Sequence, residues 1–262
     1  MIDKLSKEDI VRYLDGDILP ENVHIFDNID STNSYCKKLA DVGCEAPALV
    51  VADTQSQGRG RLGRSFFSPA GTGIYMSLLQ KTNELSVPCN LLTVAAGTAT
   101  CAELRRLCDK DIKIKWVNDI FADGKKVCGI LAEGIAAAGD THPSLVVVGI
   151  GINVSTLDFP EDIKNIAGSV NTKGITRNEI ISRVIKRFIK ICKEYSPEEL
   201  ISEYKLHSLV LGKKISFVLN NKSFVGVAED INIDGNLIVK TTEGDTITLK
   251  SGEVSLGSEN FI

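Results

Sequence analysis

The sequence predicts an α+β fold in two domains, 1–211 and 212–262. Compact β-branched runs at 48–52 and 145–154 are typical of buried strands. Segments with helical periodicity separate such runs, and this mixture indicates an α+β domain. After Gly212 the pattern changes to short alternating strands with tight turns, so a small antiparallel barrel or sheet is expected there.

Helices are expected where a capping residue precedes an apolar period. Ser6 with Asp9, and Thr176 with Glu179, have the spacing of a capping box. Pro197 suits the first turn of a further helix. The predicted helices cover 7–14, 32–40, 91–107, 177–195 and 197–208.

Strands are expected where β-branched or alternating apolar residues lie between turn residues. The first domain has such segments at 24–26, 48–52, 74–79, 112–116 and 145–154, with a hairpin over 120–131 that turns at Asp123-Gly124. The second domain has them at 215–219, 224–228, 237–241 and 246–250. The stretch 53–73 is polar and glycine-rich, so it is predicted to be largely loop.

The composition excludes several classes of protein. Of 262 residues, 43% are hydrophobic and 24% charged, which excludes disorder and collagen, and the net charge of −4 excludes a whole-chain basic field for nucleic acid. The apolar stretches are shorter than the roughly 18 residues of a membrane span. The charged N-terminus does not resemble a signal peptide, so a cytoplasmic location is predicted. Seven cysteines without a Cys-x-x-Cys pair argue against disulfides or structural zinc.

The most informative segment is 58–64, Gly-Arg-Gly-Arg-Leu-Gly-Arg. Glycine lets the backbone approach an anion closely, and arginine supplies forked donors suited to phosphate or carboxylate. The loop can therefore close over a nucleotide phosphate, although a solvated basic loop is an equal alternative from these residues alone. The same letters match the dinucleotide fingerprint, but that motif needs a strand directly before it and a helix directly after, and neither is predicted here.

Two segments hold small polar groups or glycines. Ser31, Thr32 and Asn33 cap a helix by default, and three such groups also suit a polar ligand head group such as a ureido ring. Glycines within the strand at 145–154 imply the close approach of a ligand or of a neighbouring helix. Asn153, at the end of that strand, either caps a turn or binds a base edge.

A further segment, 113–119, ends in Asn118-Asp119. Asn-Asp at a strand end usually makes a turn. With the lysines at 125–126 nearby, the same residues can instead build a charged pocket. Alternation along the strand predicts Lys115 and Val117 on one face and Trp116 and Asn118 on the other.

Together, and in this order, the segments resemble the biotin–protein ligases. The matching pieces are 30–33 (Asp-Ser-Thr-Asn), Gln55 with 58–64, 67–69 (Phe-Ser-Pro), 115–119 (Lys-Trp-Val-Asn-Asp), 125–133 (Lys-Lys-Val-Cys-Gly-Ile-Leu-Ala-Glu) and 149–154 (Gly-Ile-Gly-Ile-Asn-Val). The likeness covers roughly 26–154 by motif and the second domain by position. It implies a mixed β-sheet flanked by helices, like the catalytic domain of class II synthetases, followed by a small SH3-like β-barrel.

The resemblance implies a two-step reaction with ATP and biotin as substrates and Mg²⁺ as cofactor. Biotin's carboxylate attacks the α-phosphate of ATP to give biotinyl-5′-AMP and pyrophosphate, and a lysine of a biotin carboxyl carrier domain then takes the biotinyl group. Positive charge must offset the repulsion between two anions. A closed site must keep water from the reactive adenylate.

The likeness also implies residue roles. The catalytic residues are expected to be Lys126, Arg59, Arg61, Lys115 and Asp119. The biotin-binding residues are expected to be Ser31, Thr32, Asn33, Gln55, Gly58, Arg59, Gly60, Arg61, Lys126, Gly129, Leu131, Gly149 and Gly151. The ATP-binding residues are expected to be Arg59, Arg61, Arg64, Phe66, Lys115, Asn118, Lys126 and Asn153. Asp119 is also the residue suggested for Mg²⁺ or for orienting the incoming lysine.

The sequence departs from the family pattern where Val117 replaces proline and Phe66 replaces tryptophan. Only about 25 residues precede the first motif, too few for the winged helix of the repressor relatives, so no DNA binding is predicted. A homodimer is compatible with the resemblance. The alternatives are a lipoate–protein ligase or octanoyltransferase of the same fold, whose Arg-Arg-x-Ser-Gly-Gly-Gly loop is absent, and a non-catalytic RNA-binding module, which the negative charge disfavours.

Overall fold

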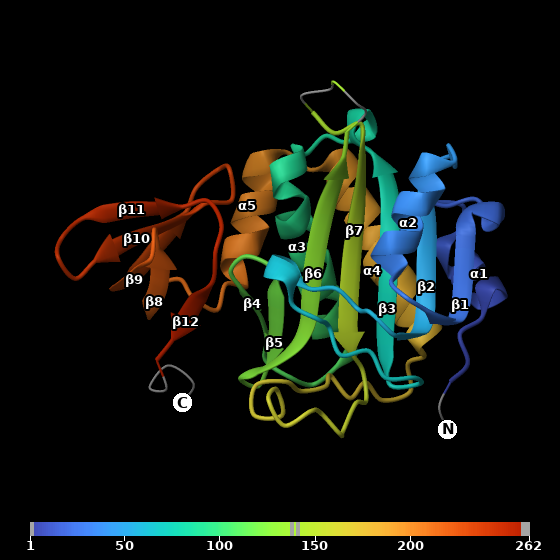
Figure 1. The fold of residues 1–262 in the computed structure, drawn as a ribbon, viewed down its shortest axis with the longest axis horizontal. Helices are drawn as coiled ribbons and strands as arrows, with labels where there is room; N and C mark the ends of the chain where they lie inside the picture. The colour runs from blue at the N-terminus through green and yellow to red at the C-terminus, as the bar shows by residue number, and fades with distance from the viewer. Residues whose placement is uncertain (1–2, 137–138, 140–141, 258–262) are drawn as a thin grey trace.

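A computed structural model describes residues 3–136, 139 and 142–257 (Figure 1). A seven-stranded sheet has the order β1-β2-β3-β7-β6-β5-β4, and a five-stranded sheet near the C-terminus has the order β11-β10-β9-β8-β12. In the large sheet β1 and β2 pair in parallel and the other neighbours pair antiparallel. The predicted α+β fold with a mixed sheet is therefore confirmed.

The strands of the large sheet are β1 (Val23–Ile29), β2 (Ala48–Gln55), β3 (Gly73–Lys81), β4 (Ile112–Lys115), β5 (Asp119–Ala122), β6 (Lys125–Ile135) and β7 (Leu145–Asn153). Those of the small sheet are β8 (Lys214–Leu219), β9 (Lys222–Ile231), β10 (Leu237–Thr241), β11 (Thr246–Leu249) and β12 (Val254–Leu256). The helices are α1 (Lys7–Leu14), α2 (Thr32–Asp41), α3 (Leu92–Leu107), α4 (Arg177–Glu194) and α5 (Pro197–Leu206). Short 3₁₀ turns lie at Pro20–Asn22, Arg61–Gly63, Thr82–Glu84 and Cys89–Leu91.

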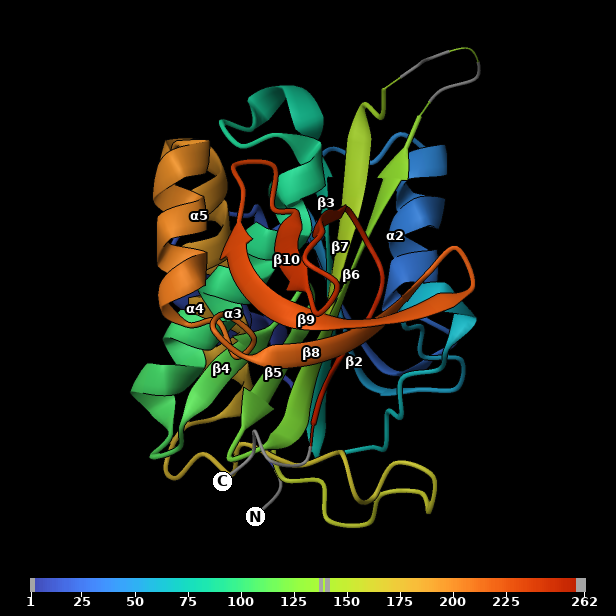
Figure 2. The same ribbon diagram turned by 90° about the vertical axis from the view of Figure 1, so that its left-hand side faces the viewer.

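Helices cover both faces of the large sheet. Figure 2 shows the sheet nearly edge-on, with α3, α4 and α5 on one side and α2 on the other. The core on the α3 side is extensive, because the middle strands bury branched residues there and α3 is buried along most of its length. The core under α2 is smaller and involves residues of α2, β2, β3 and β7.

The predicted caps form where the sequence places them. Ser6 and Thr176 each accept a hydrogen bond from the backbone N–H three residues on. The backbone N–H of Ser6 donates to Asn178 Oδ1 instead of to Asp9, and the Glu179 carboxylate accepts from Arg183 instead of from the backbone N–H of Thr176, so both predicted capping boxes are only half formed. A complete capping box joins Ser196 and Glu199 at the start of α5.

The turn between β9 and β10 of the small sheet contacts the turn between β4 and β5 of the large one. The indole Nε1 of Trp116 donates to the carbonyl of Gly235 at 2.9 Å, and both residues lie where the two sheets meet. The buried side chains of the small sheet belong to the same apolar cluster as the main core. The sheet is SH3-like, as predicted, and β12 is a strand that the sequence reading missed. The division at 211/212 stays a prediction, and the chain ends 1–2 and 258–262 lie outside the described residues.

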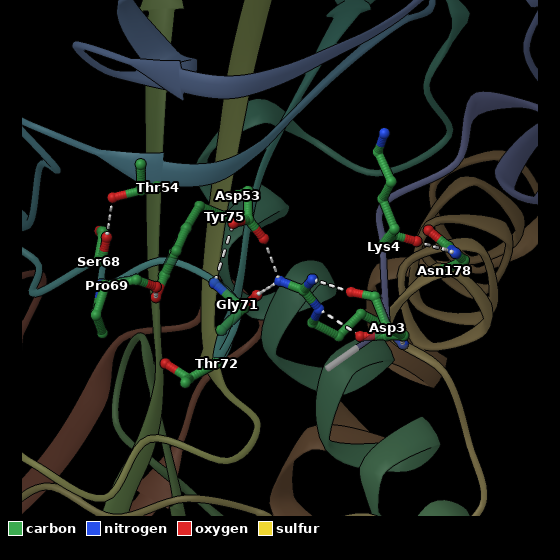
Figure 3. Close-up of polar contacts among 12 residues, drawn as sticks. Asp3, Lys4, Asp53, Thr54, Ser68, Pro69, Gly71, Thr72, Tyr75 and Asn178 are labelled. Carbon is green, nitrogen blue, oxygen red and sulfur yellow. Dashed lines mark hydrogen bonds and ion pairs between the residues drawn. The ribbon is translucent and has the colours of Figure 1, made fainter. Parts of the chain in front are cut away.

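A buried arginine at the start of α4 joins three parts of the chain. Arg177 Nε donates to Asp3 Oδ1 at 2.8 Å, and Nη1 donates to Asp53 Oδ1 at 2.7 Å and to the carbonyl of Gly73. Asp53 in turn accepts from the backbone N–H of Gly71 (Figure 3). The N-terminal segment, the end of β2 and the start of β3 therefore share one charged group.

Two predicted boundaries, those of the strand at 112–116 and of the loop at 53–73, need correction. The predicted strand at 112–116 ends at Lys115, and a turn over 116–118 leads into β5, so the expected alternation of side chains up to Asn118 is wrong. The predicted loop at 53–73 also begins later than expected, because β2 continues to Gln55. Among the described residues, no helix is both long and apolar enough to cross a membrane.

Candidate active site

An open cleft lies on the α2 face of the large sheet. The segment between β2 and β3, cyan in Figure 1, crosses in front of β6 and β7, and residues 59–61 and 64–66 of this segment line the cleft. The residues that line the cleft are Ser31, Thr32, Asn33, Gln55, Arg59, Gly60, Arg61, Arg64, Ser65, Phe66, Tyr75, Met76, Asn118, Asp119, Lys126, Gly129, Ile130, Leu131, Gly149, Ile150, Gly151 and Glu253. Most of the sequence-predicted site residues are thus brought together in one place.

One end of the cleft is built from neutral hydrogen-bonding groups. Gln55 Oε1 accepts from the backbone N–H of Thr32 at 2.8 Å and from its hydroxyl at 3.1 Å. The buried hydroxyl of Ser77, on β3, lies 2.7 Å from Thr32 Oγ1 and 2.6 Å from Asn33 Oδ1. Ser31 is the N-cap of α2, as predicted, and it also lines the cleft.

Beside this end lies the carboxylate of Glu133, on β6. Its Oε2 accepts from Asn33 Nδ2 at 2.8 Å and its Oε1 accepts from Lys37 Nζ at 2.7 Å, while Arg59 Nη1 is 4.0 Å away. Partial burial pushes the pKa of Glu133 up, but these hydrogen bonds and charges outweigh it and hold the pKa below its ordinary value. Glu133 is therefore an ionised acceptor at neutral pH.

The arginine–glycine segment folds into a narrow arm. The backbone N–H of Phe66 donates to the carbonyl of Gly58 at 2.9 Å, and the backbone N–H of Gly60 donates to the carbonyl of Arg64 at 2.8 Å. The arm turns at Leu62 and Gly63, both with positive φ. A Cβ on Gly58 would lie 2.4 Å from the carbonyl oxygen of Phe66, so only glycine permits the close pairing at the base of the arm.

Each arginine of the arm reaches a different wall of the cleft. Arg59 lies beside Glu133 on β6, and Arg61 Nη1 donates to Asn118 Oδ1 at 2.9 Å in the turn before β5. Arg64 makes a forked ion pair with Glu253, just before β12, at 2.6 and 2.8 Å. The arm thus spans the cleft from the large sheet to the small one, and guanidinium groups gather along it.

A lysine and an aspartate face each other at the other end of the cleft. Lys126 Nζ lies 2.8 Å from Asp119 Oδ2. Lys125 points elsewhere, because its Nζ donates to the carbonyl of Asn165. The pairing of β5 with β6 shifts at this point, with Ile120 opposite Cys128 and Phe121 opposite Lys126, so Val127 is passed over as a β-bulge. The bulge turns Lys126 to the face that Gly129 and Leu131 share.

The strand glycines of the cleft floor make room for side chains. A Cβ on Gly149 would lie 2.1 Å from Asn33 Oδ1, and one on Gly151 would lie 2.5 Å from the Phe66 ring. The ring of Phe66 also lies over Gly129, where a Cβ would approach to 3.2 Å. The close approach that the sequence predicted for this strand is thus made by the first turn of α2 and by the arm.

Three residues that the sequence assigned to the site stand outside the cleft lining as the structure describes it. Gly58 lies in the base of the arm. Lys115 stacks over the ring of Phe121, with Nζ 5.5 Å from its centroid, and burial lowers the pKa of this lysine. Asn153 donates to the carbonyl of Gly168, whose own N–H donates to the carbonyl of Lys126. Lys115 is thus outside the lining but close enough to Asp119 and Lys126 to feel their charges, and Asn153 is tied to the segment that pairs with the backbone of Lys126.

The sequence reading missed six lining residues: Ser65, Tyr75, Met76, Ile130, Ile150 and Glu253. Four are ordinary apolar or aromatic strand residues, and Ser65 lies within the arm, so no chemical signal marks them. Glu253 lies 189 positions from Arg64, and only the packing of the small sheet brings them together.

One carboxylate of the cleft suits a Mg²⁺ ion. Asp119 Oδ1 is buried and has no hydrogen-bond partner within residues 3–136, 139 and 142–257. In the same part of the chain, no three His, Cys, Asp or Glu side chains gather as a metal site. A single free carboxylate oxygen fits Mg²⁺ that arrives on nucleotide phosphates, since such an ion takes one or two carboxylates from the protein.

Comparison with known proteins agrees with this geometry. The family model described as "Biotin/lipoate A/B protein ligase family" matches residues 25–153, and "Biotin protein ligase C terminal domain" matches residues 210–257. The bifunctional ligase/repressor BirA of Bacillus subtilis is 31% identical, over 97% of this chain and 80% of its own length. The biotin–[acetyl-CoA-carboxylase] ligase of Mycobacterium tuberculosis is 30% identical, over 86% of this chain and 85% of its own.

Solved structures give the same result. The biotin protein ligase from Aquifex aeolicus in complex with biotin and ATP has a TM-score of 0.74 and 30% identity, over 90% of this chain and 99% of that one. A mutant of the same ligase in complex with biotin has the same score and identity. The sequence relatives, both family models and the shared fold show that this chain belongs to the biotin protein ligase family.

Proposed function

We propose that the protein activates biotin with ATP and transfers the biotinyl group to a lysine of a biotin carboxyl carrier domain. The observation that carries this proposal is the division of one cleft into two ends. The first turn of α2 and Gln55 offer neutral donors and acceptors, and Lys126 and the arm arginines supply the positive charge. A neutral ring and an anionic chain need such a pair of environments.

In the first step, an oxygen of biotin's carboxylate attacks the α-phosphorus of ATP and pyrophosphate leaves. Lys126 Nζ stands at the charged end, where it can neutralise both the carboxylate and the α-phosphate oxygens. Its ion pair with Asp119 holds the ammonium in place before the substrates arrive. Arg61 and Arg64, held at opposite walls, extend this charge along the phosphates.

In the second step, the ε-amine of the acceptor lysine attacks the acyl carbon of biotinyl-5′-AMP and AMP leaves. The arm lies over the cleft and keeps water from the mixed anhydride, which would otherwise hydrolyse. Asp119 is the nearest carboxylate to Lys126, so it is suited to orient the incoming amine.

We expect Mg²⁺ to bind together with ATP. Asp119 Oδ1 would hold it, and the ion would supply further positive charge to the phosphates.

The test is calorimetric titration with biotin, then biotin with MgATP, alongside lipoate and a pyrophosphate assay. We expect biotin to bind and pyrophosphate to be released only when both substrates are present. Binding of lipoate in place of biotin would instead favour a lipoate–protein ligase or octanoyltransferase of the same fold. Binding of neither would contradict the proposal.

A further inference from the structure

We infer that Glu133 is a positioning residue that fixes which end of the Asn33 amide faces Ser77 and the floor of the cleft. The inference rests on the proposed function, because Thr32, Asn33 and Gln55 are the residues proposed to hold biotin's ring. Neither the reaction proposed above nor the motif reading gives Glu133 a role.

The contact between Glu133 and Asn33 has a fixed direction. A carboxylate only accepts hydrogen bonds, whereas an amide presents an acceptor at one end and donors at the other. Asn33 Nδ2 donates to Glu133 Oε2 at 2.8 Å. The amide oxygen of Asn33 must therefore face the other way, where Ser77 Oγ donates to it at 2.6 Å.

The orientation of the Asn33 amide also sets the direction of the hydrogen bonds made by Ser77 and Thr32. Ser77 has one hydroxyl proton, and it faces both Asn33 Oδ1 and Thr32 Oγ1. Thr32 Oγ1 gives its own proton to Gln55 Oε1 at 3.1 Å. A reversed Asn33 amide would point donors at Ser77 and take that acceptor away, so the pattern offered at this end of the cleft would change.

Packing makes the direction costly to reverse. Ser77 is fully buried and Asn33 is 5% exposed, so water does not replace a lost partner. The amide oxygen of Asn33 sits directly over Gly149, where a Cβ would come within 2.1 Å. Lys37 and Arg59 hold the Glu133 carboxylate from its other side. Glu133 is thus fixed by charge on one side and fixes Asn33 on the other.

The first test is Glu133→Gln, which keeps the shape, but Lys37 and Arg59 are donors and take the new amide's oxygen, so its NH₂ group is left facing Asn33 Nδ2. We expect the Kd for biotin to rise at least about tenfold. We expect kcat for biotin-dependent pyrophosphate release, at saturating biotin, to stay within about threefold, because Lys126, Arg61 and Arg64, which are proposed to act on the phosphates, are held by other partners. Glu84→Gln removes an exposed glutamate from a surface pair with Lys81 and serves as the matched control, with the parent's Kd expected.

The second test exchanges donor and acceptor. Asn33→Asp alone sets two carboxylates against each other and should weaken biotin binding most. Asn33→Asp combined with Glu133→Gln restores one donor and one acceptor, still with an oxygen facing Ser77. We expect the double variant to recover at least about tenfold of the affinity lost by Asn33→Asp. A role in stability alone would leave the double variant no better than either single one.

The outcomes separate this inference from the proposed function. If the parent protein binds biotin and Glu133→Gln binds it equally well, the positioning role is wrong and the function stands. If the double variant is as weak as Asn33→Asp alone, the directional argument fails in the same way. A parent protein that does not bind biotin overturns the proposed function, and this inference with it.

Discussion

Lys126 and Asp119 form an ion pair at 2.8 Å across β5 and β6, beside a β-bulge that the structure places at Val127. The side chains of both are partly exposed at the cleft, and the second oxygen of Asp119 has no partner in the described part of the chain. The pair thus holds the Lys126 ammonium in place and leaves Asp119 Oδ1 available to accept a further ligand.

Lys126→Ala should abolish most biotin-dependent pyrophosphate release while the fold survives. Removing one charged group that stabilises a transition state typically costs about 10²–10³ in rate. Lys125→Ala is the matched control, since its side chain is exposed and binds Asn165, and it should keep the parent rate. Parent-like release by purified Lys126→Ala would exclude the proposed role.

Asp119→Asn should raise the Mg²⁺ concentration needed for half-maximal pyrophosphate release. An amide is a weaker ligand for a hard cation than a carboxylate, and the ion pair with Lys126 is lost as well. Biotin binding without ATP serves as the control. An unchanged Mg²⁺ requirement would show that the ion does not use this carboxylate.

Gly149→Ala should weaken biotin binding at least about tenfold, or about 1.4 kcal/mol. The new methyl group would meet Asn33 Oδ1 at 2.1 Å and displace the amide. Gly97→Ala, in the buried part of α3, is the control, because its methyl group would meet other atoms only at 3.7 Å or more. The comparison of Kd values by calorimetry decides the point; equal values for parent and Gly149→Ala would contradict it.

Arg177→Met should lower the free energy of unfolding by about 3 kcal/mol, because it leaves the carboxylates of Asp3 and Asp53 without their buried cation. Arg183→Met, on the same helix, removes only an exposed pair with Glu179 and should cost about 0.3–0.5 kcal/mol. Urea denaturation measures both. A similar loss in the two variants would mean that the Arg177 network contributes little.

The stability that Glu133 contributes should depend on pH. Its folded-state pKa lies below the ordinary value, so the ionised carboxylate stabilises the fold above the unfolded pKa, and this is lost as pH falls through the folded one. The difference in unfolding free energy between parent and Glu133→Gln should therefore shrink as the pH falls from about 5 through the lowered folded-state pKa. A constant difference over that interval would argue against an ionised Glu133.

Local patterns predicted most of the elements. The capping residue Ser31, the Asp123-Gly124 turn and the buried runs in β2 and β7 act through neighbours in sequence, so the chain alone was sufficient. Strand ends were less accurate, because the residues after Lys115 leave the strand for a turn, and β12 was missed because it is only 3 residues long.

The sequence alone determined the family and most of the cleft residues, because motif order and residue chemistry are written along the chain. Only the tertiary structure decided which residues meet. Strict alternation along β6 would place Lys125 with Gly129, and the bulge at Val127 reverses that. The Arg64–Glu253 pair and the Asn33–Glu133 contact join positions 189 and 100 residues apart. Such contacts follow from how sheets and loops pack, and no local pattern records that packing.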